Sequence, residues 1–338
     1  MATLLLPERL SDDARWLAQA LDASSGMIRF VEMDRAAYRA ASFLDDRMLQ
    51  APHNAVICRL DEAARAVNSS NRDDARWIFH IGHVGSTLIA RLLGEIEGVL
   101  CLREPRILRD LTPLDQSERE TLIPAVVRLM SRTFAGEEVA LVKATSFVSE
   151  IASELVSQGQ RALFLFEGPR TYIEGILAGE NSRKEQRTLA DVRVRRMAER
   201  VDRLTWADRS DARLAAAAWA CEMTALEAAA DAMLGRQVLW AKFDPMLGDM
   251  PASLRRLAEF FEFNSTEKRL HEIASGPLMR RYSKALEYEY SPSLRRELLA
   301  EAGRDHRADI DQAIAMLNQA APNSPLLARA LSRAELER

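Results

Sequence analysis

Short apolar runs alternate with stretches of helical periodicity along the chain from residue 77 onward. The apolar runs cover residues 77–81, 99–102, 139–142, 162–166 and 238–243, and the helical patterns lie near 87–96, 115–131, 147–157, 170–178 and 188–234. Continuous apolar strands separated by helices are typical of a parallel sheet with helices on both faces. Because ligands of such sheets bind beyond the carboxyl ends of the strands, we expect the turns after the first four strands to converge on one crevice.

The first 72 residues do not follow this alternation and are predicted to form an N-terminal extension. We expect a helix from Ser11 through Leu21, a strand over 28–33 and a short helix that begins at Asp61. A polar stretch at 68–74 has the composition of a turn and separates the extension from the first apolar strand.

The rest of the chain divides into a main domain and a helical C-terminal segment. The main domain is predicted over residues 73–265, with a helical insertion at 180–234, and the helical segment over 266–338 forms a cap. Within the insertion, residues 215–221 read Ala-Ala-Ala-Ala-Trp-Ala-Cys and are expected on a core helix.

The composition is that of a globular protein with a substantial core. Of 338 residues, 48% are hydrophobic and 28% are charged, and the formal net charge of −4 argues against a dedicated nucleic-acid-binding protein. No apolar run approaches the roughly 20 residues that a membrane-spanning helix needs. The cysteines Cys58, Cys101 and Cys221 are far apart, so we expect no metal site and no disulfide framework, and a reducing, cytoplasmic location.

A glycine-containing loop follows the first apolar strand and reads Gly82-His-Val-Gly-Ser-Thr87. The two glycines permit a tight backbone path, and the backbone N–H groups of such a turn, together with the positive end of the following helix, bind phosphate or sulfate. The candidate binding residues are Gly82, His83, Val84, Gly85, Ser86 and Thr87. We therefore expect a three-layer α/β sandwich of the P-loop (NTPase-like) kind, with a mainly parallel sheet, an N-terminal extension and a helical C-terminal cap. A turn without a ligand is the structural alternative.

The loop departs from the Walker A pattern at two positions. Where that pattern has a glycine the chain has His80, and where it has a lysine the chain has Ser86. An ordinary ATPase is therefore not expected. His83, at the apex of the loop, supplies a cation only when its imidazole is protonated. His80 is expected to satisfy a hydrogen bond in the core.

The loop and two further segments resemble the sulfotransferase superfamily. His83-Val-Gly-Ser-Thr87 is similar to the family's 5′-phosphosulfate loop, and Leu102-Arg-Glu-Pro105 is similar to its Glu-Pro segment. Residues 238–247 and 251–261 resemble its last strand, turn and helix, so the resemblance covers about residues 77–265. It implies transfer of a sulfuryl group from 3′-phosphoadenosine-5′-phosphosulfate to a hydroxyl or amine of a small-molecule or peptide acceptor.

The chain departs from this family where the 3′-phosphate of the donor is usually bound. The usual arginine and serine are replaced by Glu167 and Gly175, and a carboxylate beside a phosphate repels it. Either Arg170 or the basic face of the insertion takes over this task, or the donor lacks a 3′-phosphate. That basic face is expected to be a solvated helix surface; it comprises Arg193, Arg196, Arg200 and Arg203.

Two charged residues at strand ends are the candidates for catalysis, besides His83. Glu104 is the candidate general base, because transfer to a hydroxyl needs a group that accepts its proton. The alternative is that Glu104 only pairs with a nearby arginine, Arg103, Arg106 or Arg109, and shapes its loop. Lys143 ends the third apolar strand, where an ammonium stabilises the charge that develops during transfer. Thr145 and Ser146 after it are expected to cap the next helix.

The leading expectation is thus a sulfotransferase-like enzyme with a nucleotide donor. Two alternatives stay open. One is a P-loop kinase or nucleotide hydrolase that uses ATP or GTP, and the other is a nucleotide-binding protein that has lost catalysis.

Overall fold

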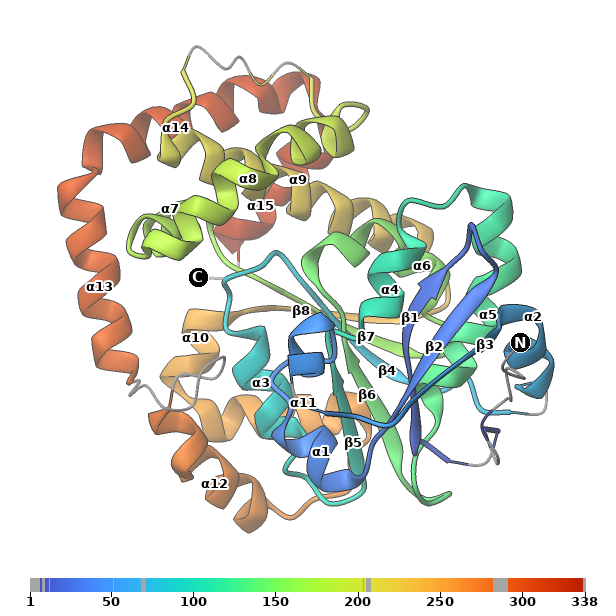
Figure 1. Cartoon of the computed structure of the whole chain (residues 1–338). Helices are drawn as coiled ribbons and strands as arrows, with labels where there is room; N and C mark the ends of the chain where they lie inside the picture. Colours follow the sequence, from blue (N-terminus) through green and yellow to red (C-terminus); the bar gives the residue numbers. More distant parts are fainter. Residues whose placement is uncertain are drawn as a thin grey trace.

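A five-stranded parallel sheet forms the centre of the protein (Figure 1). The computed structural model describes residues 7, 10–11, 13–50, 52–67, 71–202, 204, 208–281 and 291–336. The strand order is β5-β6-β4-β7-β8, and every neighbouring pair is parallel. The strands are β4 (Arg76–His80), β5 (Val99–Arg103), β6 (Val139–Lys143), β7 (Arg161–Phe166) and β8 (Gln237–Lys242). All five apolar runs predicted as strands are confirmed.

The order of the strands reverses at β4. The chain leaves β4 for the edge strand β5, returns to β6 on one side of β4, and crosses to β7 on the other side. In a parallel sheet this reversal opens a crevice at the carboxyl ends of the strands, where ligands bind. The loop that follows β4 therefore begins at the position that the topology assigns to a ligand.

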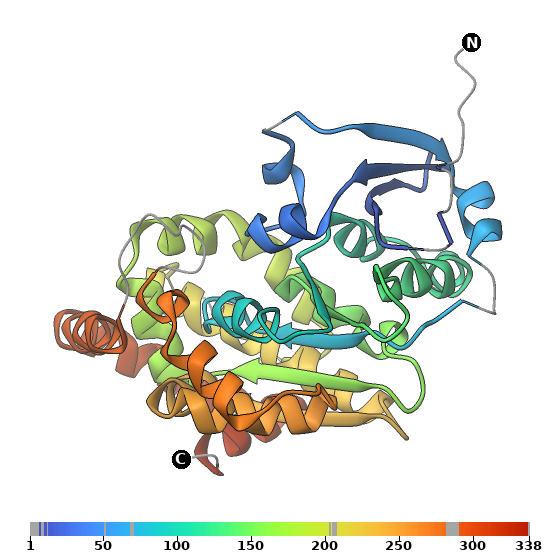
Figure 2. The same ribbon diagram turned by 90° about the horizontal axis from the view of Figure 1, so that it is seen from below.

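Helices flank the sheet on both faces, which confirms the layered α/β architecture (Figures 1 and 2). The helices that connect the strands are α3 (Ser86–Leu93), α4 (Arg106–Leu111), α5 (Gln116–Ser131), the 3₁₀ helix η2 (Ser146–Ile151) with α6 (Ala152–Leu155), and α7 (Pro169–Leu177). Apart from α4, which was not predicted, they match the predicted helical patterns near 87–96, 115–131, 147–157 and 170–178. After β8 follow α10 (Phe243–Gly248), α11 (Met250–Phe261) and α12 (Glu267–Ser275).

The N-terminal extension contains a small antiparallel sheet, which Figure 2 shows beside the main sheet. Its strands are β1 (Trp16–Asp22), β2 (Met27–Glu32) and β3 (Ala55–Arg59), with α1 (Arg35–Ala40), the 3₁₀ helix η1 (Asp46–Gln50) and α2 (Leu60–Ala66). The strand over 28–33 and the helix near Asp61 are confirmed. Residues 68–70 of the expected turn at 68–74 lie outside the described residues.

The helix expected from Ser11 through Leu21 is wrong. Residues 16–22 form β1, which pairs with β2 across a turn in which Gly26 has a φ of 65°. Leu17, Ala18 and Leu21 are buried, and β1 packs against α4. The apolar spacing of this segment fits a helix, but strand pairing and burial against α4 decide its conformation. β3, a largely exposed edge strand, was not predicted.

The helical insertion consists of two packed helices, α8 (Glu180–Met197) and α9 (Asp211–Ala232), in place of one long stretch. α9 is buried over most of its length, as a core helix should be. The expectation of a solvated basic face is wrong, because Arg193 is only 3% exposed and pairs with the fully buried Glu222 of α9. Arg196 pairs with Glu222 and Glu150, and Arg200 pairs with Glu150. Arg203 lies outside the described residues.

Three helices follow near the C-terminus: α13 (Pro292–Asp305), α14 (Arg307–Ala320) and α15 (Pro325–Leu336). α13 packs on α7, α14 on α7 and α9, and α15 on α9 (Figure 1). Within the described residues, no helix is both long enough and apolar enough to cross a membrane. The cap of helices thus borders the same end of the sheet as the loop after β4.

Candidate functional site

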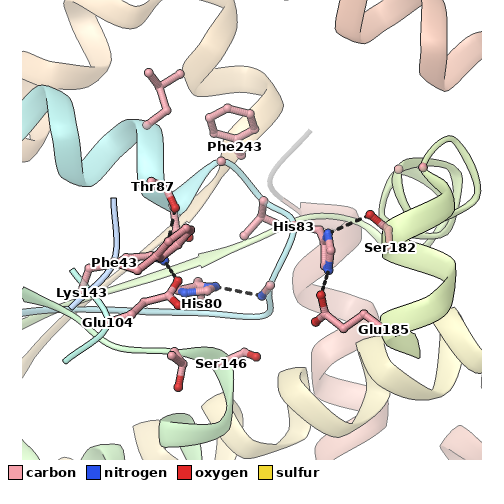
Figure 3. A pocket seen from close by; sticks show the side chains of 18 of the residues that line it. Phe43, His80, His83, Thr87, Glu104, Lys143, Ser146, Ser182, Glu185 and Phe243 are labelled. Carbon is pink, nitrogen blue, oxygen red and sulfur yellow. Dashed lines mark hydrogen bonds and ion pairs between the residues drawn. The ribbon is translucent and has the colours of Figure 1, made fainter. Parts of the chain in front are cut away.

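A cavity of about 800 Å³ opens at the carboxyl ends of the parallel strands (Figure 3). Among the described residues, five Lys/Arg and three Asp/Glu side chains line it, whereas the whole chain has a net charge of −4. The charged lining residues are Asp45, Arg47, Glu104, Arg109, Lys143, Glu185, Arg281 and Arg295. An excess of positive charge in a concave site of an acidic protein favours an anionic ligand.

All six residues of the predicted loop line this cavity: Gly82, His83, Val84, Gly85, Ser86 and Thr87. Gly82, His83 and Gly85 have φ angles of 81°, 54° and 64°, in the left-handed region that favours glycine. A Cβ on Gly85 would lie 2.1 Å from the ring of Phe243, so a side chain does not fit there. Gly85 is the N-cap residue of α3 and makes no side-chain capping hydrogen bond. Its first-turn N–H groups lack helical acceptors, which is the geometry of an anion site.

His80 stabilises the loop through the hydrogen bonds of its ring, as predicted for a core histidine. Its Nδ1 accepts a hydrogen bond from the N–H of Gly82 at 2.9 Å, and its Nε2 lies 2.9 Å from the carbonyl oxygen of Ala144. Since a carbonyl only accepts, Nε2 carries the hydrogen and the ring is the neutral Nε2–H tautomer. The N–H of Gly82 therefore stabilises the loop itself, and the N–H groups that remain for a ligand belong to the loop residues after Gly82.

Lys143 and Glu104 form a buried ion pair on the floor of the cavity (Figure 3). The Lys143 side chain is 1% exposed, and its Nζ also lies 3.4 Å from the Thr87 hydroxyl at the start of α3. Glu104 has a φ of 55°, and its N–H donates to the carbonyl oxygen of Lys143 at 2.7 Å. A left-handed glutamate is strained, and such residues gather at functional sites. The two predicted catalytic residues thus lie together and in contact with the loop.

Two of the three arginines suggested as alternative partners of Glu104 have other partners, and the third, Arg109, lines the cavity. Arg103 donates to the backbone carbonyl oxygens of residues 38, 39 and 41. Arg106 pairs with Asp46 and Asp110. The carboxylate of Glu104 instead lies between Lys143 and Arg47.

The N-terminal extension contributes residues that the sequence did not reveal. The N–H of Leu44 donates to the carbonyl oxygen of Arg103 at 2.7 Å, which places residues 43–47 beside the end of β5. Arg47 lies 3.2 Å from Glu104, stacks on Phe43 with its guanidinium carbon 3.4 Å from the ring centre, and pairs with Asp45. Burial opposes ionisation of Asp45, but the hydrogen bonds from Arg47 outweigh it and hold the pKa of Asp45 below its ordinary value.

His83 contacts two residues of α8, which the sequence did not reveal either (Figure 3). The Oγ of Ser182 lies 3.3 Å from Nδ1 of His83, and a carboxylate oxygen of Glu185 lies 3.4 Å from Nε2. Both ring nitrogens of the apical histidine are therefore engaged by the helical insertion.

Of the predicted residues that follow β7, only some line the cavity. Arg170 pairs with Asp311 on the surface and does not line the cavity. Glu167 is 4% exposed and does not line it either; it accepts a hydrogen bond from the N–H of Asp244, at the start of α10. Burial and then the neighbouring Asp244 raise the pKa of Glu167 to about 7. Gly175 does line the cavity.

Thr145 and Ser146 also line the cavity, and their predicted capping role is corrected. Thr145 stands at the first position before η2, but its side chain caps nothing there. Its buried hydroxyl has no hydrogen-bond partner within the part of the chain that the structure describes.

The comparisons with known proteins find a likeness in structure, and the example described below is a distant one. No protein-family model matches the sequence, and no curated protein matches it. A solved structure named "Sulfotransferase Domain from the Curacin Biosynthetic Pathway" is similar to this chain, with 11% sequence identity and a TM-score of 0.44. The match covers 73% of this chain and 98% of that one. A likeness of this size does not assign the chain to a family, so the function must follow from the site itself.

Proposed function

We propose that the protein is a sulfotransferase-like enzyme that transfers a sulfuryl group from a nucleotide donor to a hydroxyl or amine. The observation that carries this proposal is the buried Lys143–Glu104 pair, which contacts Thr87 at the start of an uncapped helix. It puts a cation and a carboxylate next to a loop with the geometry of an anion site. Residues 82–87 hold the phosphosulfate end of the donor.

The chemistry needs one proton acceptor and one source of positive charge. A bond forms between the acceptor oxygen or nitrogen and sulfur, the bond from sulfur to the bridging oxygen breaks, and the acceptor proton goes to Glu104. Negative charge grows on the bridging oxygen as it leaves. Lys143, the loop N–H groups and a protonated His83 stabilise this charge more strongly in a buried site than they would in water.

The identity of the donor depends on which residues can bind a 3′-phosphate. Arg170 and the insertion arginines have carboxylate partners, and the Glu167 carboxylate lies against α10 and not in the cavity. The electrostatic objection to a 3′-phosphate is therefore weaker than the sequence suggests. Arg281 lines the cavity from the C-terminal part of the chain and is the candidate for such a phosphate; Arg295 also lines it, but pairs with Asp244.

Thermal-shift titration tests the choice of nucleotide. The full chain is titrated with adenosine 3′,5′-bisphosphate, adenosine 5′-phosphosulfate, ATP and GTP, since a ligand at 100 times its Kd stabilises the folded state by about 2.7 kcal/mol. Stabilisation by the bisphosphate or the phosphosulfate, reduced in Thr87→Val but not in the matched surface variant Thr121→Val, supports the proposal. Stabilisation by ATP or GTP alone supports the kinase or hydrolase alternative and overturns it. A bisphosphate complex without sulfuryl transfer to any of a panel of alcohols, phenols and amines supports the non-catalytic alternative.

A further inference from the structure

The two contacts of His83 with α8 determine where its hydrogens lie. Ser182 and Glu185 are three residues apart and share one face of the helix, so they meet the imidazole together. Glu185 only accepts, and Nε2, which faces it at 3.4 Å, therefore carries a hydrogen in either protonation state. Protonation then changes only Nδ1, which lies 3.3 Å from the Ser182 hydroxyl.

The Ser182 hydroxyl can meet both states of Nδ1, but with opposite roles. When the ring is neutral, Nδ1 accepts and the serine hydroxyl donates to it. When the ring is protonated, Nδ1–H donates to the serine oxygen, and the hydroxyl hydrogen turns to another acceptor. Ser182 lines the cavity. One proton on His83 therefore gives the cavity both a positive charge and a further O–H donor.

Glu185 is held in place by the ion pairs of the insertion. Arg193 lies 3.9 Å from Glu185 and 3.6 Å from the fully buried Glu222, and Arg196 also pairs with Glu222. This network keeps a carboxylate beside His83, and a nearby carboxylate favours the imidazolium.

Among the described residues, the other ionisable groups around His83 do not offer the same uptake of a proton near neutral pH. Within the part of the chain that the structure describes, the charged groups that line the cavity are carboxylates, arginines and one lysine: Asp45, Glu104 and Glu185, Arg47, Arg109, Arg281 and Arg295, and Lys143. His80 faces the Gly82 N–H with Nδ1, so a second proton there would oppose a donor. Glu167 has a pKa of about 7 but lies outside the cavity lining, and it needs its own control.

We infer that an anion binds to the loop together with a proton, which His83 takes up while the Ser182 hydroxyl turns toward the anion. The inference rests on the proposed function in one respect, because it takes the anion to be the phosphosulfate end of a donor. In the binding step the chain, the anion and one proton from solvent form the complex, and no covalent bond other than Nδ1–H is made. The affinity of the site then falls with increasing pH, and α8 is part of the donor site.

Isothermal titration calorimetry counts the proton. The full chain is titrated with adenosine 3′,5′-bisphosphate at pH 7.5 in buffers of different ionisation enthalpy, and the dependence of the heat on that enthalpy gives the protons taken up. At this pH, phosphate esters with a second pKa near 6 are almost fully ionised, so a proton taken up on binding goes to the chain. We expect uptake of about 0.5 proton or more per ligand bound, and less than about 0.2 overturns the inference.

Five variants assign the proton to a residue. His83→Lys keeps a cation and is expected to retain binding without uptake, whereas Ser182→Ala retains uptake with an affinity about 3- to 10-fold lower. Glu185→Gln reduces the uptake, and the exposed Glu180→Gln on the same helix leaves it unchanged. The Glu167→Gln control must also leave it unchanged; loss of uptake in that variant assigns the proton to Glu167 and overturns the inference.

A second probe separates this inference from the proposed function. If the bisphosphate does not bind but inorganic pyrophosphate binds with uptake that depends on His83, the inference stands and the proposed donor is wrong. If the bisphosphate binds without uptake, the inference is wrong and the proposed donor stands. If neither probe binds, both are wrong.

Discussion

The buried pair of Lys143 and Glu104 supports a prediction that separates stability from catalysis. Removing one partner of a buried ion pair typically costs about 3–5 kcal/mol, whereas removing both charges costs much less. Glu104→Gln takes the opposite charge away from an ammonium that is 1% exposed, so we expect a loss of about 3 kcal/mol. Lys143→Met leaves Arg47 beside the carboxylate at 3.2 Å, and its cost should be smaller, about 1–3 kcal/mol.

Urea unfolding of the two single variants and of the double variant K143M/E104Q measures the interaction between the two sites. The side-chain volumes are nearly kept, so the double variant should be more stable than the sum of the single losses predicts, by about 2 kcal/mol. The exposed pair Glu180 and Lys184 on α8 provides the matched control, and its interaction should stay below about 0.5 kcal/mol. Losses that simply add would refute the energetic coupling of the buried pair.

Activity of the same variants tests catalysis independently of stability. Loss of the general base should reduce sulfuryl transfer by about 10²–10⁴-fold, and loss of the Lys143 charge by about 10²–10³-fold. In the proposed mechanism both groups act on the transferring atoms, so the double variant should regain stability but not activity. A single variant that transfers at the wild-type rate while folded would remove its residue from the mechanism.

Three further predictions follow from other contacts. The pKa of Glu167 is about 7 in the folded chain against an ordinary value of 4.5, so its contribution to stability is complete below pH 4.5 and is lost as the pH rises through 7. In urea unfolding, the wild-type chain should lose about 3 kcal/mol of stability as the pH rises over this range, and Glu167→Gln should not show this loss. The same pH dependence in both chains would contradict the assignment. Gly85→Ala should abolish bisphosphate binding in calorimetry, because its Cβ meets the Phe243 ring at 2.1 Å, and Phe243→Ala in the same chain should restore part of it; no restoration would point to the backbone angle alone. Arg47→Ala should lower kcat about 10-fold or more with unchanged bisphosphate affinity, since it touches Glu104 and not the loop; a change in affinity alone would place Arg47 in the donor site.

The main sheet was predictable because its strands are buried on both faces. Residues 162–166 are fully buried, so the run carries no polar position that would obscure the strand. The loop was predictable for a related reason, since Gly82 and Gly85 adopt the left-handed angles that their residue type suggests. Local sequence determines these features almost completely.

The rest of the site depends on contacts between distant segments. Arg47 meets Glu104 only because the backbone of Leu44 pairs with the end of β5, and residues 41–50 show no periodic pattern that would announce it. The apolar spacing of residues 16–22 permits both a helix and a strand, so the sequence alone does not distinguish them. The sequence does contain a signal for the inward orientation of Arg193, because Glu222 is an isolated acid within the apolar run of α9 and needs a partner once buried.

The loop therefore differs from the Walker A pattern in where its positive charge originates. The lysine that the pattern places inside the loop is absent, but Lys143 reaches Thr87 from the neighbouring strand β6, and the histidine at the apex is held by α8. The glycine that the pattern places before the loop is His80, which binds the first loop amide. We therefore propose that different elements of the fold supply what the missing residues would provide. Because β6 and α8 position these groups, the site forms only when the sheet and the insertion are both folded, and variants that loosen α8 without touching the loop should weaken anion binding.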